Sequence, residues 1–168
     1  MLLATGLLSG CDSTPRERQE VAREGVRELD TLARAAARKV ARAGRATARY
    51  DAANRARRAQ PLDPRQEIKM EDQLMGPYAS HLADLTPSDL PAAYAQLVRA
   101  ARARRATWTD RDWDYARAVY RRLNDHLKQI RLDLPARAEL PIRARQAEFV
   151  ALQAGHAATG ISEAAKAK

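Results

Sequence analysis

The chain has 168 residues, about one domain, and carries a formal net charge of +9 at pH 7. It contains 36 Ala and 25 Arg but only 10 Val and Ile together, a balance that favours helix and argues against a sheet-based fold. A single cysteine excludes a disulfide within the chain. We therefore predict an all-α protein, an elongated antiparallel helical bundle with one long N-terminal helix.

The N-terminus has the pattern of an export signal. Residues 1–10 are uncharged and apolar, end in small residues, and are too short to span a bilayer as a helix. The segment from Leu8 to Cys11 (LSGC) resembles the bacterial lipobox. That resemblance implies a signal peptide over 1–10, lipid on Cys11 and a tether over 11–14. No Lys or Arg precedes the apolar stretch, so we expect the signal to be truncated and the true start codon to lie upstream.

The first helix is predicted from Pro15 to about Ala59, because proline follows the capping residue Thr14 and none interrupts this stretch. Its apolar and small residues have the three-and-four spacing of a packed seam, at Leu29, Leu32, Ala36, Val40, Ala43, Thr47 and Tyr50. Opposite the seam lies a stripe of arginines, at Arg34, Arg38, Arg42, Arg45 and Arg49.

Positive charge is concentrated in this helix. Residues 31–60 hold nine basic residues and one acid, Asp51, and so carry a charge of +8. Such a surface favours an anionic partner, an envelope protein or an anionic polymer. The alternative is a solvated face produced by GC-rich codon usage. We expect no nucleic-acid partner, because the helix offers only Tyr50 for base stacking.

Further helix starts follow in chain order. We predict a short helix over 64–75 that ends at Gly76-Pro77, a turn or two over 78–85, and a helix over 87–106. The next helix, about 110–131, carries a helical seam of Trp113, Ala116, Tyr120, Leu123, Leu127 and Ile130. The last helix kinks or restarts near Pro141 and runs to about Ala158. Gly160 is predicted to end it, so that the bundle domain covers 15–160 and a frayed tail covers 161–168.

No catalytic or metal site emerges. Asp110, Asp112 and Asp114 have the spacing that opens a calcium loop, but the glycine and glutamate of that loop are missing, so we interpret them as helix-start charges. The histidines, at 81, 126 and 156, do not pair at helical spacing. His126 is interpreted as a partly exposed residue on a helix face. We expect no cofactor, no metal and no enzymatic activity.

Trp108, Trp113 and Tyr115 form an aromatic cluster that could bind a partner. The alternative is structural: Trp113 and Tyr120 fill the core while Trp108 staples the start of the helix. The string from Ala106 to Trp113 (ATWTDRDW) resembles a motif, Trp-Thr-x-x-Asp-Trp, that opens a helix in a family of uncharacterised all-helical bacterial lipoproteins. The resemblance implies an address and a fold but no activity.

We expect a lipid-anchored scaffold in the bacterial cell envelope, held to the membrane through Cys11, that binds another envelope component without catalysis. A periplasmic holdase-type chaperone and an envelope enzyme with a site assembled from distant residues are the alternatives. The sequence leaves open the leaflet and the oligomeric state.

Overall fold

The computed structural model describes residues 15–167, and these residues form helices and turns without strands. The signal peptide, Cys11 and the tether predicted for residues 1–14 lie outside the described residues. The all-α prediction is confirmed. The chain divides into two compact units, one up to Arg45 and one from Ala46 onward.

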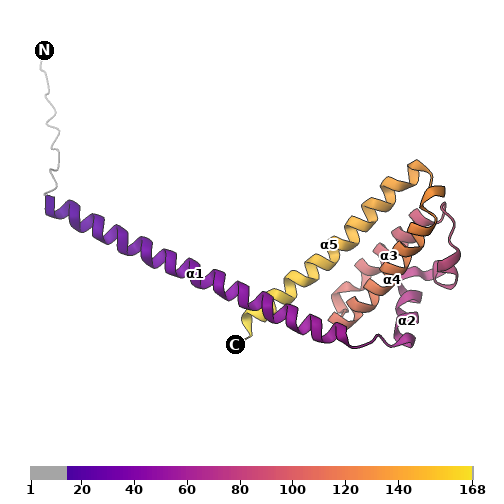
Figure 1. Cartoon of the computed structure of the whole chain (residues 1–168), viewed down its shortest axis with the longest axis horizontal. Helices are drawn as coiled ribbons and strands as arrows, with labels where there is room; N and C mark the ends of the chain where they lie inside the picture. Colours follow the sequence, from indigo (N-terminus) through magenta and orange to yellow (C-terminus); the bar gives the residue numbers. More distant parts are fainter. Residues whose placement is uncertain (1–14, 168) are drawn as a thin grey trace, which may run out of the picture. The chain divides into compact units, whose positions relative to one another are not determined.

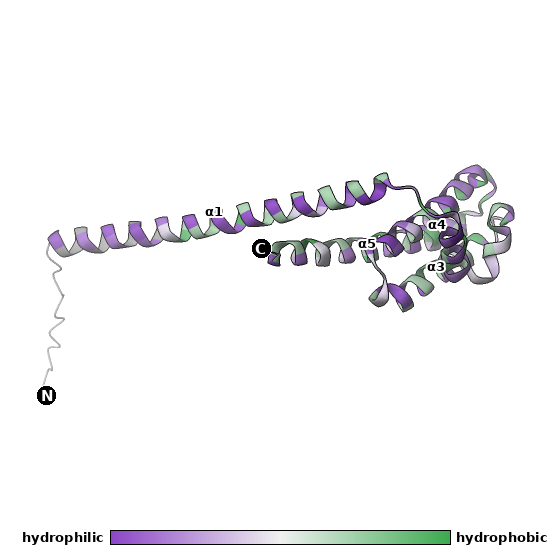
Figure 2. Ribbon diagram, turned by 90° about the horizontal axis from the view of Figure 1, so that it is seen from below, coloured by the Kyte–Doolittle hydropathy of each residue, from purple (hydrophilic) through white to green (hydrophobic). Residues whose placement is uncertain are grey.

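Helix α1 spans Pro15–Ala59, the bounds expected from its flanking prolines. In the first unit, Leu32 and Val40 of the predicted seam are 60% and 73% exposed, so this part of the seam is not buried in the described chain. The side chain of Leu29 lies outside the described residues. Figure 2 shows hydrophilic and hydrophobic residues alternating from turn to turn along α1.

The second unit holds the core. It contains α2 (Pro64–Met75), the 3₁₀ segment η1 (Gly76–Asp84), α3 (Leu90–Arg104), α4 (Asp110–Gln129) and α5 (Ala136–Lys166). Short 3₁₀ turns, η2 (Arg105–Thr107) and η3 (Arg131–Asp133), connect the last three helices. Helix α2 packs on α3 and α4, and α3 packs on α5, as Figure 1 shows.

The helix starts in this unit follow local chemistry. The Asp63 side chain accepts a hydrogen bond from the Arg65 N–H at the start of α2. At the start of α4, Thr109 and Asp112 form a complete capping box. Helix α2 ends at Gly76, which has φ 54°, a conformation that glycine adopts without a Cβ clash.

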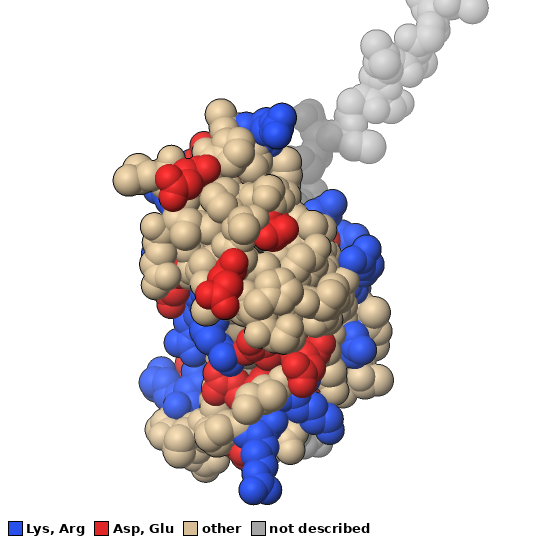
Figure 3. Space-filling view, turned by 90° about the vertical axis from the view of Figure 1, so that its right-hand side faces the viewer, with Lys and Arg blue, Asp and Glu red and all other residues tan. Residues whose placement is uncertain are grey.

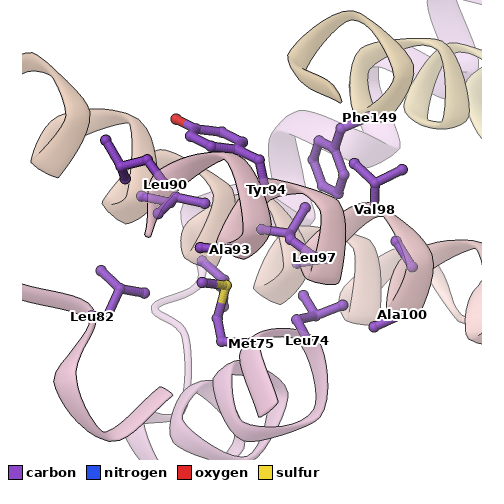
Figure 4. Packing of buried hydrophobic residues seen from close by; sticks show 14 of the residues in the cluster. Leu74, Met75, Leu82, Leu90, Ala93, Tyr94, Leu97, Val98, Ala100 and Phe149 are labelled. Carbon is purple, nitrogen blue, oxygen red and sulfur yellow. The ribbon is translucent and has the colours of Figure 1, made fainter. Parts of the chain in front are cut away.

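Apolar side chains of α2, α3 and α5 meet in one cluster (Figure 4). Leu74 and Met75 of α2 lie against α3, and Phe149 of α5 lies beside Tyr94 and Val98. Leu74 and Phe149 are fully buried, and burial of a side chain of this size stabilises the fold by about 1.5–3 kcal/mol. The Tyr94 hydroxyl points out of the cluster and donates a hydrogen bond of 2.7 Å to Asn124 Oδ1.

Two predicted boundaries were wrong. Helix α3 begins at Leu90, because Thr86 and Asp89 bond to each other and hold the preceding residues in a turn. Helix α5 runs through Gly160 to Lys166, so Gly160 does not end it and residues 161–166 are helical. Pro141 lies inside α5. Among the described residues, no helix is both long enough and apolar enough to cross a membrane.

Candidate functional site

Three arginines surround a buried carboxylate on α4. Asp114 is only 6% exposed and accepts a hydrogen bond from Arg57 Nε of α1 at 2.7 Å. Arg117 Nη1 lies 3.3 Å from the same carboxylate and Arg58 Nε lies 3.5 Å from it. One negative charge is thus shared by three guanidinium groups, which leaves a local surplus of positive charge.

The pKa shifts of this group reflect that surplus. Burial by itself raises the pKa of Asp114, but the hydrogen bond and the charge of Arg57, with Arg117 and Arg58, outweigh it and hold the pKa below its usual value. The pKa of Arg117 is lowered, first by burial and then by the like charge of Arg58. Asp114 is therefore ionised at neutral pH, while Arg117 remains crowded by cations.

A second carboxylate connects this group to α5. Asp110 accepts from Arg57 Nη1 at 2.8 Å and lies 2.7 Å from His156 Nε2. The His156 ring stacks on Trp113, with the ring centroids 5.2 Å apart and the ring planes inclined by 23°. Side chains of α1, α4 and α5 are joined in one polar network within the second unit.

Two cavities flank the stacked rings of Trp113 and His156, and Tyr50 lines both. The smaller, about 290 Å³, has four arginines in its wall, Arg55, Arg57, Arg58 and Arg117, and one acid, Asp51. The larger, about 910 Å³, runs along α5 past Gly155 and Gly160 and includes Trp108. The smaller cavity therefore has a strongly cationic lining.

Two residues that line the smaller cavity each have a buried side-chain nitrogen without a hydrogen-bond partner in the described structure. These nitrogens are Trp113 Nε1 and Gln153 Nε2, both buried and both donors. Buried donors are nearly always satisfied by protein or by ordered water. Both nitrogens are inaccessible to solvent, so an acceptor in the cavity reaches them only if a side chain shifts.

A third cavity, about 620 Å³, lies between the end of α4 and the start of α5. Its charged residues are largely paired with one another: Lys128 lies 2.7 Å from Asp125, and Arg143 lies 2.5 Å from Glu139. Its amides are also satisfied, since Gln146 donates to Asn124 at 2.6 Å. This cavity also has more cations than acids in its wall, four against two, which is a smaller excess than the four against one of the smaller cavity.

The predicted aromatic residues have structural contacts. Trp113 is 2% exposed and Tyr115 is 7% exposed, so neither offers a partner a surface in this structure. Trp108 precedes the capping residue Thr109 and packs edge-on against Trp113, with ring centroids 4.9 Å apart. This contact is a hydrophobic staple at the start of α4.

The arginines of the predicted stripe are all exposed. In the first unit, Arg34 pairs with Asp30 at 2.7 Å. Arg38, Arg42 and Arg45 make no ion pair among the described residues. Arg49, in the second unit, donates to the carbonyl of Ala167 at 3.2 Å.

Three interpretations of polar residues need comment. His126 is buried, not partly exposed as predicted, because its Nε2 reaches the Leu85 carbonyl at 2.7 Å across the fold. Asp112 does cap its helix, whereas Asp110 and Asp114 have tertiary partners that their helix-start interpretation missed. Within residues 15–167, no group of His, Cys, Asp and Glu side chains could hold a metal ion.

Sequence reasoning also missed the network itself. The four-residue spacing of Asp110 and Asp114 places both carboxylates on one face of α4, which is the only local signal for it. Arg57 and His156 lie on helices that are distant from Asp110 in the sequence, so residue spacing does not predict their contacts with Asp110. Comparison with protein-family models, with curated proteins and with solved structures found no match.

Proposed function

We propose that the protein is a non-enzymatic helical scaffold, tethered to the membrane, that binds an anionic component of the bacterial cell envelope. The observation that carries this proposal is the arginine face of the first unit, defined as Arg38, Arg42 and Arg45. All three side chains are exposed and have no acidic partner among the described residues. Their spacing of four and three residues places them on one side of α1.

The lack of acids around the arginine face favours a partner over codon usage. Codon preference raises the number of arginines everywhere, but it does not remove acids from one segment. Residues 31–50 contain no Asp or Glu. Arg57, Arg102 and Arg122 of the second unit each pair with a carboxylate, whereas Arg38, Arg42 and Arg45 have no acid within one helical turn on either side. On the face shown in Figure 3, acidic side chains lie next to Lys and Arg.

The membrane tether rests on the lipobox resemblance around Cys11. If Cys11 carries lipid and residues 1–10 are removed, the membrane-extracted protein has the mass of residues 11–168 plus acyl chains. Intact mass spectrometry measures this directly. An unmodified mass that includes residues 1–10 would remove the tether from the proposal.

The binding role is tested by affinity recovery from cross-linked envelopes. A variant with Arg38, Arg42 and Arg45 changed to Gln keeps helix propensity and removes three charges. In the matched control, three other exposed arginines are changed to Gln: Arg65, Arg99 and Arg137. These three lie outside the arginine face and make no ion pair among the described residues. The proposal expects the anionic component to be lost only from the first variant. Equal recovery by both variants would contradict it.

One observation favours the holdase alternative. Leu32 and Val40 of the first unit are exposed apolar side chains that an unfolded client could contact. A holdase suppresses aggregation of unfolded clients at stoichiometric amounts, and this effect should fall when both residues are changed to Gln. Absence of suppression by the unchanged protein would remove this alternative.

One observation favours the enzymatic alternative. His156 lines two cavities and is oriented by Asp110, as a general base would be. Such a base should hydrolyse activated phosphate or carboxylate esters at a rate that falls in His156→Asn. A rate equal to that of the buffer, or one that survives His156→Asn, would exclude it.

A further inference from the structure

The smaller cavity of the second unit, bounded by α1, α4 and α5, combines three features that a ligand would explain. Its wall is cationic, two of its lining residues have unsatisfied buried donors, and its volume of about 290 Å³ is large enough for a small anion. We propose that this cavity binds the oxyanion group of a small ligand, a phosphate or a carboxylate, on Arg55, Arg58 and Arg117. This proposal does not depend on the arginine face of the first unit.

The charge balance of the cavity wall favours an anionic ligand. Asp114 is bonded most closely to Arg57, at 2.7 Å, so Arg58 at 3.5 Å and Arg117 at 3.3 Å are only partly neutralised. Asp110 is likewise engaged, by Arg57 and His156. Arg55 makes no ion pair among the described residues. The cavity wall thus has guanidinium donors that the protein's own acids do not satisfy.

Arg117 lies among like charges. Its side chain is 29% exposed, and its pKa is lowered first by burial and then by the charge of Arg58, with smaller contributions from Arg121 and Arg57. An oxyanion between Arg58 and Arg117 would relieve the repulsion and form charge-assisted hydrogen bonds, the strongest class in proteins. Binding should therefore stabilise the folded protein.

Two residues of the cavity lining also have unsatisfied donors. Trp113 is 2% exposed, and its indole N–H has no acceptor among the described residues. The Gln153 amide nitrogen lacks one as well. A small shift of either side chain on binding would bring its donor within reach of a ligand oxygen or of a water held by the ligand.

The indole of Trp113 makes the site observable. It lies in the cavity wall, and the chain has only one other tryptophan, Trp108. Titration of the full chain with inorganic phosphate at constant ionic strength, followed by tryptophan fluorescence, should give a saturable change. Acetate under the same conditions separates a carboxylate preference from a phosphate preference, and saturation by either anion supports the proposal.

Variants assign the signal to the cavity. Loss of one charge-assisted hydrogen bond should weaken binding about ten- to a hundredfold, so we expect this in Arg55→Gln and in Arg58→Gln. Arg65→Gln removes an equal charge outside the cavity and should not change the affinity. The Arg55 side chain is exposed and unpaired among the described residues, so its replacement should not disturb folding.

Two results would overturn the proposal. One is the absence of a saturable change with both anions while circular dichroism shows a folded protein. The other is an equal loss of affinity in Arg65→Gln, which would mean that only net charge matters. The arginine-face variant of the first unit should bind phosphate normally, so failure of this proposal and failure of the proposed function are distinguishable.

Discussion

Replacement of Asp114 by Asn should destabilise the second unit strongly. The carboxylate is 6% exposed and has Arg57, Arg58 and Arg117 around it. Removal of one partner from a buried ion pair costs about 3–5 kcal/mol because the remaining charge is left uncompensated. The Arg57 side chain is 19% exposed and Arg58 is 51% exposed, so water recovers part of this cost. We expect a loss of about 3 kcal/mol in the free energy of unfolding.

The assay is thermal and denaturant unfolding of the full chain, followed by circular dichroism. For a unit of this size, about 3 kcal/mol corresponds to a decrease of roughly 10 °C in Tm. The control is Asp125→Asn, whose side chain is 63% exposed and pairs with Lys128 on the surface. That change should cost less than about 0.5 kcal/mol.

The pH dependence gives a second test of the same prediction. Because the folded pKa of Asp114 lies below its unfolded value, the carboxylate stabilises the fold above the unfolded pKa of about 3.9. This stabilisation is lost as the pH falls through the folded pKa. The difference between the unchanged protein and Asp114→Asn should be constant near neutrality and shrink in acid. Equal stability of Asp114→Asn and Asp125→Asn at pH 7 would refute the reasoning.

Four further substitutions test the packing and the helix capping of the second unit. Gly155→Ala should stabilise α5 by about 1 kcal/mol, because the added Cβ meets open space. Gly160→Ala should be less stable than Gly155→Ala by about 1–3 kcal/mol, because its Cβ would lie 2.4 Å from the Tyr50 ring. Melting curves of the two variants, recorded side by side, measure this difference. Thr109→Ala removes the capping box and should cost about 0.5–2 kcal/mol in urea unfolding. Phe149→Ala empties a fully buried site and should cost about 3–5 kcal/mol, seen as a lower urea midpoint at unchanged slope.

The sequence was most informative where structure is decided locally. The start of α2 at Asp63 and Pro64, the capping box at Thr109 and the stop at Gly76 depend on residues within one turn of each other. The predicted seam of α4 is confirmed at Trp113 and Leu123, which are both buried.

Two of the errors arose where a contact between distant residues decides the structure. Gly160 looked like a helix stop, but its missing side chain accommodates the Tyr50 ring and α5 continues past it. His126 looked like a surface residue, but the Leu85 carbonyl binds it in the interior. Neither partner is visible from local spacing.

The candidate cavity was not predictable for the same reason. Arg57 and Asp114 are separated by 57 residues, and Asp110 and His156 by 46. Each residue alone is typical of a solvated helix face. Only the packing of α1, α4 and α5 within the second unit makes them neighbours, and packing of distant segments has no periodic signature.

Salt dependence of partner recovery from envelopes that have not been cross-linked tests the proposed binding role. The unchanged protein should retain an anionic envelope component at low salt and lose it progressively as salt screens the three charges. The variant with Arg38, Arg42 and Arg45 changed to Gln should fail to retain it even at low salt. Retention by this variant at every salt concentration would place the binding surface elsewhere on the protein and refute the role of the arginine face.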